Sequence, residues 1–238
     1  FETDRIPLEW LGHIEPFDEV WVISEHNRAA FLRGGVAPER LRVIPSGLDT
    51  DVYRPDGPTR ELPGSLQDRF VFLSVFDWQL RKGWDVLLRA YVATFTANEG
   101  VGLLLKISRV QGQQREAIEH EADEVLRSLG TSLAARGDIV LLDDPLTMLD
   151  MAALYRSVDA FVLPSRGEGW GRPLMEAMAC GLPTIGTGAS GNVDFMTPDN
   201  SFLVGATLVA VPPAAVHEVP PYAGHQWFEP DAAELAQV

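Results

Sequence analysis

One stretch of this 238-residue chain limits its fold strongly, because a strand-like run, a glycine-rich loop and a helical segment follow one another directly. Residues 158–164 form a short apolar run, which predicts a buried strand. Residues 174–179 predict a helix, and Pro173 suits its first turn, where the N–H that proline lacks would be unpaired anyway. The loop between them contains three glycines. A strand that leads straight into a helix in this way is typical of α/β proteins.

The same alternation of strands and helices extends through most of the chain. Further strands are predicted at residues 70–76, 101–108, 138–142 and 183–186, with an edge strand or hairpin arm at 201–204. Helices are predicted at residues 84–95, 114–135 and 149–158. This order implies a doubly wound parallel sheet with helices on both faces, in which ligands bind beyond the carboxyl ends of the strands. Residues 205–226 contain four prolines and are expected to form a lid or surface loop.

Changes in composition divide the chain into three predicted parts. Residues 1–45 predict a small strand–helix–strand unit, and residues 46–69 are rich in proline, glycine and charge, as in a linker. Residues 70–238 form the predicted main domain. We expect the chain to be a fragment of a longer one, with this domain cut at its C-terminal end. There, a helix with a cap at Asp231 stops after about two turns, which is too short to be stable alone.

The charge balance excludes some classes of partner. Nineteen basic residues against 34 acidic ones give a net charge of −15, which disfavours nucleic acid and anionic membranes. A phosphate site must therefore be built locally, so basic residues near the glycine-rich loop are informative. The single cysteine, Cys180, is compatible with a reducing compartment, and no apolar run reaches the ~18 residues of a membrane helix. We expect a cytoplasmic protein without a transmembrane segment.

The glycine-rich loop carries the first set of candidate binding groups. Its backbone amides, added to the positive end of the helix dipole, predict a site for an anion or a polyol. Glu168 lies in the loop and Glu176 about one turn into the helix, so both carboxylates are expected at one pocket mouth. Carboxylates accept hydrogen bonds from hydroxyls, and amides bind phosphate oxygens. A nucleotide sugar carries both kinds of group.

A second strand-to-helix loop carries the candidate cations. Arg81 and Lys82 follow the predicted strand at residues 70–76 and precede the helix that begins near Trp84. Two cations beside a helix N-terminus can hold a diphosphate. Asp77 is close to them in sequence and is unfavourable near a diphosphate, unless it points away or pairs with Arg81. The alternative is a solvated basic pair on an exposed loop.

The residues of both loops resemble those of a known family. The run from Glu168 to Pro183 is similar to the paired-glutamate motif of the retaining glycosyltransferases of family 4, which have the GT-B architecture. Arg81-Lys82-Gly83 resembles their phosphate-contacting loop, and residues 44–49 and 188–195 resemble flanking segments. The resemblance covers residues 16–238. It implies a Rossmann-like donor-binding domain at residues 70–238 and, at residues 1–45, the end of an incomplete Rossmann-like acceptor domain.

The resemblance also implies a reaction and roles for single residues. A hexose would pass from a nucleoside-diphosphate sugar to an unknown acceptor (a saccharide, lipid or protein) without a metal ion or cofactor. Glu168 is the expected catalytic residue beside the donor sugar, Glu176 would bind the ribose hydroxyls, and Arg81 with Lys82 would steady the diphosphate. The chain departs from many relatives at Phe76-Asp77, where they have Gly-Arg. The expected substrate-binding residues are Arg81, Lys82, Gly169, Trp170, Gly171, Arg172 and Glu176.

Two other functions remain open on the sequence. A non-catalytic nucleotide-sugar-binding module, or a subunit that depends on a partner, would carry the same loops. An NAD-dependent oxidoreductase is disfavoured because no Gly-x-Gly-x-x-Gly follows the first strand and the glycine-rich loop comes late. Asp143-Asp144 is a conceivable metal ligand pair, against the simpler interpretation of a polar loop after a strand.

Overall fold

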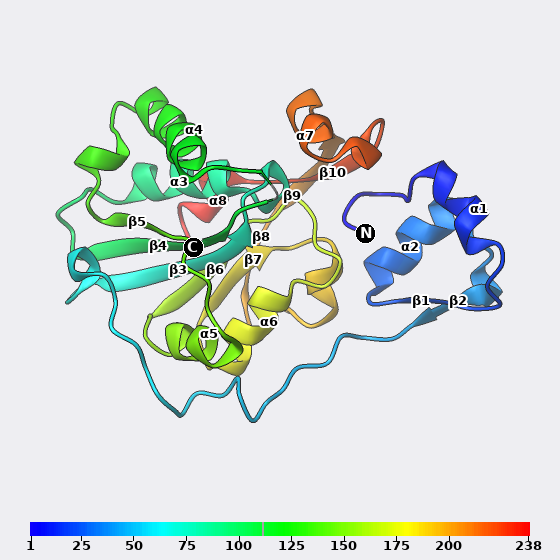
Figure 1. The fold of residues 1–238 in the computed structure, drawn as a ribbon, viewed down its shortest axis with the longest axis horizontal. Coiled ribbons are helices and arrows are strands. Elements are labelled where there is room, and N and C mark those ends of the chain that lie inside the picture. Colours follow the sequence, from blue (N-terminus) through cyan, green and yellow to red (C-terminus); the bar gives the residue numbers. More distant parts are fainter. Residues whose placement is uncertain (111) are drawn as a thin grey trace.

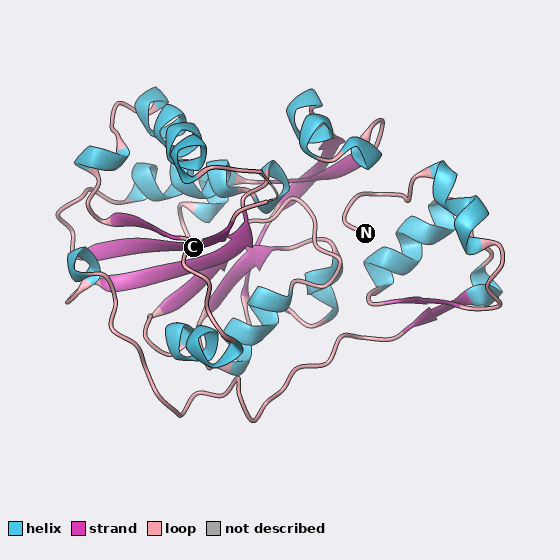
Figure 2. Ribbon diagram, viewed as in Figure 1, coloured by secondary structure: helices cyan, strands magenta, loops and turns pink. Residues whose placement is uncertain are grey.

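The computed structural model describes residues 1–110 and 112–238, and its centre is a six-stranded sheet (Figures 1 and 2). The strands are β3 (Phe70–Asp77), β4 (Val101–Ser108), β5 (Ile139–Leu142), β6 (Ala160–Leu163), β7 (Thr184–Thr187) and β8 (Phe202–Val204). All neighbouring strands are parallel, in the order β5-β4-β3-β6-β7-β8. The segment at 201–204 is thus an edge strand, one of the two alternatives expected.

The strand order fixes where the chain changes direction. It first winds outward from β3 through β4 to β5, then returns to the centre at β6 and winds the other way to β8. β3 pairs with β4 from Phe70↔Val101 to Asp77↔Ser108, and with β6 at Phe72↔Ala160. The loops that follow β3 and β6 therefore begin at the point of reversal, the usual place for a ligand in such sheets.

Helices cover both faces of the sheet, as Figure 1 shows. α3 (Trp84–Thr94), α4 (Arg115–Ser128) and the short α8 (Ala232–Leu235) lie on one face. α5 (Met148–Tyr155) and α6 (Arg172–Ala179) lie on the other. The doubly wound α/β fold predicted from the alternation is confirmed.

Apolar spacing explains how these elements pack. In α3 the buried side chains recur at helical spacing, so one face of the helix meets the sheet. β4 is covered on both faces, and Leu103, Leu104 and Leu105 are fully buried, as expected for a central parallel strand. α5 begins with a capping box in which Thr147 and Asp150 satisfy each other's backbone amides.

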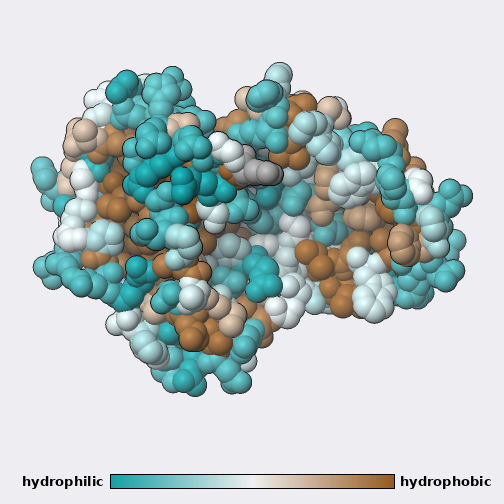
Figure 3. All heavy atoms as spheres, in the orientation of Figure 1, coloured by the Kyte–Doolittle hydropathy of each residue, from teal (hydrophilic) through white to brown (hydrophobic). Residues whose placement is uncertain are grey.

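The N-terminal part has its own small core. β1 (Val20–Val22) and β2 (Leu41–Val43) are parallel and joined through α2 (Glu25–Arg33), with α1 (Leu11–Ile14) beside them. The buried residues of this core are Ile6, Val22, Val36 and Leu41. Large apolar side chains also remain exposed here, among them Leu8, Phe17, Trp21 and Ile44. Brown patches interrupt the hydrophilic surface of this part in Figure 3.

The segment between β2 and β3 contains no strand and no α-helix in the structure, only a 3-10 turn at Gly64–Leu66. Tyr53 and Leu66 of this segment are buried in the core of the six-stranded sheet, so the connection is packed against the main body. The division into residues 1–45, 46–69 and 70–238 stays a prediction. No helix in the described ranges combines the length and apolar character needed to cross a bilayer.

The expectation of a lid or surface loop at residues 205–226 is wrong. β9 (Ala206–Ala210) pairs antiparallel with β10 (Gln226–Pro230), and α7 (Pro213–Glu218) lies between them. The prolines are compatible with this because Pro213 occupies the first turn of α7, where its missing N–H costs nothing. The sequence analysis missed β9 because its partner, β10, follows only after α7. Val211, Ala215, Tyr222 and Trp227 form a core beneath this hairpin.

Candidate functional site

The two loops predicted to form the site touch each other directly. A 3-10 turn at Leu80–Lys82 follows β3 and ends at Gly83, whose φ of +68° favours glycine. A Cβ at Gly83 would lie 1.9 Å from the carbonyl oxygen of Pro164, at the end of β6, so no side chain fits there. The amide of Arg166 donates to the carbonyl of Arg81 at 2.7 Å. The chain thus joins the two loops backbone to backbone.

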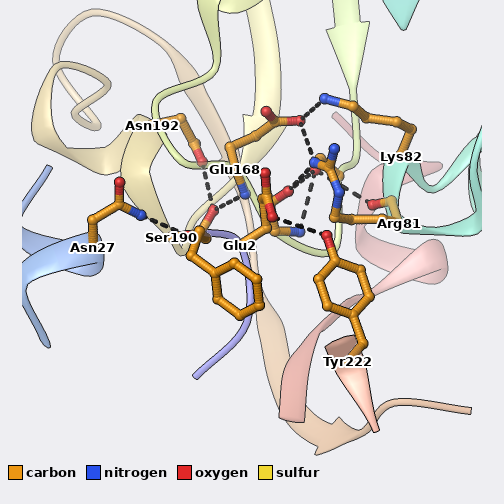
Figure 4. Close-up of polar contacts among 11 residues, drawn as sticks. Glu2, Asn27, Arg81, Lys82, Glu168, Ser190, Asn192 and Tyr222 are labelled. Atoms are coloured by element: carbon orange, nitrogen blue, oxygen red, sulfur yellow. Dashed lines mark hydrogen bonds and ion pairs between the residues drawn. The ribbon is translucent and has the colours of Figure 1, made fainter. Parts of the chain in front are cut away.

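The predicted cations lie on the predicted catalytic glutamate (Figure 4). Lys82 Nζ is 2.6 Å from Glu168 Oε1, and Arg81 Nη1 is 3.7 Å from the same oxygen. Arg81 Nη1 also donates to the carbonyl of Gly167 at 2.7 Å. All three charged side chains are buried. Burial alone would raise the pKa of Glu168, but Lys82 and Arg81 hold that pKa below its ordinary value, so Glu168 is ionised at neutral pH.

A third loop fixes the backbone of Glu168. Its amide donates to Ser190 Oγ at 3.0 Å, and Ser190 Oγ donates to Asn192 Oδ1 at 3.0 Å (Figure 4). The amide of Gly191 returns a bond to the carbonyl of Glu168 at 2.9 Å. Ser190 has φ of +70°, a conformation rare for residues with a side chain and often associated with functional sites. Sequence reasoning assigned no role to Ser190 or Asn192, because α6 and β7 separate Ser190 from Glu168 in the chain and Asn192 acts only through Ser190.

The glycine-rich loop leaves backbone amides available. The amides of Gly169, Trp170 and Gly171 find no protein acceptor among residues 1–110 and 112–238. Gly171, with φ of +89°, is the N-cap of α6, so these amides stand beside the positive end of that helix. The indole of Trp170 donates to Met175 Sδ at 3.2 Å and packs against Phe195, which holds the loop in shape. A polar ligand can therefore bind amides that are already in place.

Most of the predicted site residues line one open pocket. Its volume is about 360 Å³, and its walls come from the ends of β3 and β4, the loop after β6 and the first residues of the chain. Asp77 lies at this pocket, is exposed, and within the described ranges forms no ion pair with Arg81 within 4 Å. The predicted residues among its walls are Arg81, Lys82, Glu168, Gly169, Trp170, Gly171 and Arg172.

The structure does not bring Glu176 to this pocket with Glu168. Glu176 Oε2 accepts from the hydroxyl of Tyr155 at 3.0 Å, and Oε1 is 3.6 Å from Arg172 Nη2. Burial raises the pKa of the Glu176 carboxyl, although the Tyr155 hydroxyl and Arg172 oppose this. Burial next to Glu176 also raises the pKa of Tyr53 to about 12. The predicted ribose-binding carboxylate therefore sits among tyrosines that the sequence did not point to.

The structure adds one carboxylate that sequence reasoning missed. Glu2 lines the same pocket, and Glu2 Oε2 accepts from the hydroxyl of Tyr222 at 2.9 Å. No sequence signal marks Glu2, because its neighbours in space come from the far end of the chain.

One of the two candidate metal ligands, Asp143 and Asp144, has other partners. Asp143 pairs with the guanidinium groups of Arg109 and Arg115. Across residues 1–110 and 112–238, His, Cys, Asp and Glu side chains form no group of three or more suited to a metal ion.

Comparison with known proteins gives relatives of one kind. Residues 67–215 match the family model described as Glycosyl transferases group 1. A D-inositol 3-phosphate glycosyltransferase of Catenulispora acidiphila is 32% identical over 159 residues, which is 66% of this chain and 37% of that protein. An MMP alpha-(1->4)-mannosyltransferase of Mycolicibacterium hassiacum is 29% identical over 225 residues, 90% of this chain and 49% of that one. The chain thus spans less than half the length of these relatives.

Solved structures share the fold. Anabaena HepE in complex with UDP and glucose matches with a TM-score of 0.67 and 21% identity, over 83% of this chain and 53% of HepE. The E. coli trehalose-6-phosphate protein bound with UDP-2-fluoro glucose matches with a TM-score of 0.67 and 17% identity, over 96% of this chain and 53% of that one. At these identities the likeness speaks for the fold, and the family follows from the match over residues 67–215. The chain belongs to the group 1 glycosyl transferases.

Proposed function

We propose that this chain supplies the donor-binding half of a retaining glycosyltransferase, which transfers a hexose from a nucleoside-diphosphate sugar to an acceptor hydroxyl. The observation that carries the proposal is the meeting of the β3–α3 and β6–α6 loops at the reversal of the sheet. There, two cations, a carboxylate and three available amides share one pocket. These are the groups that a sugar diphosphate requires.

The proposed chemistry concerns charge on the leaving group. As the oxygen of the acceptor hydroxyl bonds to the anomeric carbon, the bond to the nucleoside diphosphate breaks, negative charge grows on the phosphate oxygens, and the leaving diphosphate takes up the hydroxyl proton. Arg81, Lys82 and the amides of residues 169–171 would stabilise that charge without a divalent metal ion. Glu168, ionised and buried, would accept from sugar hydroxyls and steady positive character at the ring.

The ion pair between Lys82 and Glu168 leaves Lys82 able to bind a phosphate as well. The ammonium has three protons, of which one is directed to Glu168 Oε1, so the others remain for a phosphate oxygen. The ion pair can then bind both parts of the donor, with Glu168 accepting from the sugar and Lys82 donating to the diphosphate. The names of known proteins support a nucleoside-diphosphate sugar as donor. The relatives include a D-inositol 3-phosphate glycosyltransferase and a mannosyltransferase, and structural neighbours were solved with UDP or UDP-glucose.

Calorimetric titration with UDP, GDP, ADP and NAD, without added metal, tests the proposal. We expect one nucleoside diphosphate to bind in the micromolar range, typical of a small polar ligand (about −8 kcal/mol). Binding of NAD alone would instead favour an oxidoreductase. A folded sample that binds none of the four would contradict the donor site, and donor binding without turnover in the presence of acceptors would favour a binding module.

Lys82→Ala, with Arg89→Ala as its control, tests the phosphate role. We expect Lys82→Ala to weaken the binding of a nucleoside diphosphate about tenfold or more, because one charge-assisted hydrogen bond is lost. The binding of the nucleoside should change little. Arg89 is an exposed cation of α3 away from the pocket, so Arg89→Ala should bind as the parent does. Equal affinities in all three proteins, each folded by circular dichroism, would remove Lys82 from the site.

A further inference from the structure

The first residues of the chain are fastened on two sides and lie against the glycine-rich loop. On one side, Asn27 Nδ2 donates to the carbonyl of Phe1 at 2.5 Å. On the other, the amide of Asp4 donates to the carbonyl of Gln226 at 2.9 Å, and the amide of Gln226 donates to Asp4 Oδ1 at 2.7 Å. The segment thus runs from α2 to β10, and Glu2 is held between these two fixed points.

Glu2 is packed against the loop that carries Glu168. A Cβ at Gly167 would lie 2.1 Å from the carbonyl oxygen of Glu2, so the two backbones are in contact and only glycine allows it. Figure 4 shows the Glu2 side chain close to Glu168, with Tyr222 and Arg81 beside it. Glu2 is one of the residues that line the pocket.

One oxygen of Glu2 remains free to accept. Oε2 receives the hydroxyl of Tyr222 at 2.9 Å, and Oε1 receives no hydrogen bond from any side chain or amide of the described ranges. An ionised carboxylate can only accept, so a phosphate would be repelled by it and a hydroxyl attracted. Both the ribose and the hexose of a sugar nucleotide carry hydroxyls, and the ribose is expected at Glu176, which does not line this pocket, so the hexose is the part that this wall would meet.

We propose that Glu2 binds a hydroxyl of the donor hexose and so contributes to the choice of donor sugar. This inference rests on the proposed donor site and adds to it a residue from outside the two loops. In each carboxylate one oxygen is already bonded and the other is open to a sugar hydroxyl: Glu168 Oε1 accepts from Lys82, and Glu2 Oε2 accepts from Tyr222. The sugar would then lie between two carboxylates from separate parts of the chain, one in the first residues and one in the β6–α6 loop.

A different role for Glu2 makes a different prediction. If Glu2 only balanced the charge of Arg81, its removal would change the affinity for a nucleoside diphosphate and for its sugar conjugate by the same factor. If Glu2 binds the hexose, the conjugate alone loses a contact. The ratio of the two dissociation constants therefore separates the roles.

The experiment titrates parent, Glu2→Ala and Glu9→Ala with a nucleoside diphosphate and with its glucose and mannose conjugates. UDP and its conjugates are titrated first, followed by those of GDP and ADP. Glu9 is an exposed carboxylate of the same N-terminal part and is not in the pocket, so Glu9→Ala should match the parent. We expect Glu2→Ala to lower the preference for the better conjugate over the bare diphosphate about tenfold, the value of one hydrogen bond to a charged group.

Each outcome is decisive. An unchanged ratio in folded Glu2→Ala, with diphosphate binding intact, overturns the role of Glu2 and leaves the proposed function standing. A parent that binds no nucleoside diphosphate overturns both. If Glu2→Ala does not fold, Tyr222→Phe answers the question, because it keeps the carboxylate and removes the bond that orients it. The same ratio should then fall several-fold, and an unchanged ratio contradicts the inference.

Discussion

Glu168 and Glu176 belong to one short stretch of sequence, yet their surroundings shift their pKa values in opposite directions. Burial favours the protonated form of both carboxyls. For Glu168 the cations Lys82 and Arg81 outweigh burial and lower the pKa. For Glu176 the hydroxyl of Tyr155 and the exposed Arg172 do not outweigh burial, and the pKa is raised. The paired glutamates therefore contribute to stability in different ranges of pH.

Glu168→Gln should cost the most stability at neutral pH. Because the folded-state pKa of Glu168 is lowered, its ionised form stabilises the protein above the ordinary value of 4.5, and this contribution is lost as the pH falls through the lower folded-state pKa. The variant leaves Lys82 buried without its partner, at a cost of about 3 kcal/mol at pH 7. Urea denaturation at a series of pH values should show the gap to the parent narrowing on acidification. A gap that widens would contradict the ion pair.

Glu176→Gln should show the opposite trend. The folded-state pKa of Glu176 is raised, so its contribution is fully present at low pH and is lost as the pH rises through that value. The neutral amide can still accept from Tyr155 and has no proton to lose. The same urea series should therefore show Glu176→Gln gaining relative to the parent as the pH rises. Parallel curves for parent and variant would argue against a raised pKa.

At the scale of elements, the site depends on the contact between the β3–α3 and β6–α6 loops. Gly83→Ala puts a methyl group 1.9 Å from the carbonyl of Pro164 and forces the loops apart. We expect a loss of about 4 kcal/mol or more, together with loss of nucleotide binding. Gly130→Ala is the matched control, since Gly130 also has positive φ (+79°) but has nothing within 4 Å of its Cβ position. It should cost only about 1–2 kcal/mol of backbone strain.

These two values separate contact from backbone strain. They can be measured by thermal unfolding, with calorimetry to follow binding. Similar losses in Gly83→Ala and Gly130→Ala would mean that the loops can move apart without consequence, and that their backbone contact does not build the site.

The elements of the sheet were predictable because each one is marked by its own residues. β4 was expected at residues 101–108 and occupies Val101–Ser108, since a continuous apolar run has few other ways to be buried. Both binding loops followed from glycines and charges next to such strands. The hairpin of β9 and β10 was missed because its pairing joins residues on either side of a helix and several prolines.

The site was predictable only as far as it is local. The strand pattern implies that Arg81, Lys82 and Glu168 come together. The loops that carry them follow parallel strands, so both lie at the carboxyl edge of the sheet. Glu2 meets Tyr222 across 220 positions of sequence, and Ser190 reaches Glu168 across 22. The spacing of residues does not predict such contacts. The sequence analysis therefore missed both the loop that carries Ser190 and the first residues of the chain.

At the scale of the whole molecule, the hydrophobic interior is divided. The main core surrounds the six-stranded sheet, while the N-terminal part has a separate core around Ile6, Val22 and Leu41. A small core buries less apolar surface and should open more easily. We expect amides of β1, β2 and α2 to exchange with solvent through openings about 2 kcal/mol or more below those of β3 and β4. Native-state hydrogen exchange measures this, and equal opening energies throughout would indicate one cooperative unit.

The fastening of the first residues to β10 has a consequence for how the molecule is assembled. Thr3 Oγ1 lies 2.8 Å from His225 Nδ1, a contact that closes a loop of 222 positions. Closing so long a loop costs entropy that shorter connections avoid, and contacts of such high order form slowly. A nascent chain can complete its central sheet before the ribosome has added residues 222–226, and at that stage the segment that carries Glu2 lacks its bonds to Tyr222 and Gln226, although Asn27 already bonds to Phe1. On the proposed role of Glu2, the full wall of the pocket would then form later than the sheet, once residues 222–226 have bonded to the segment that carries Glu2.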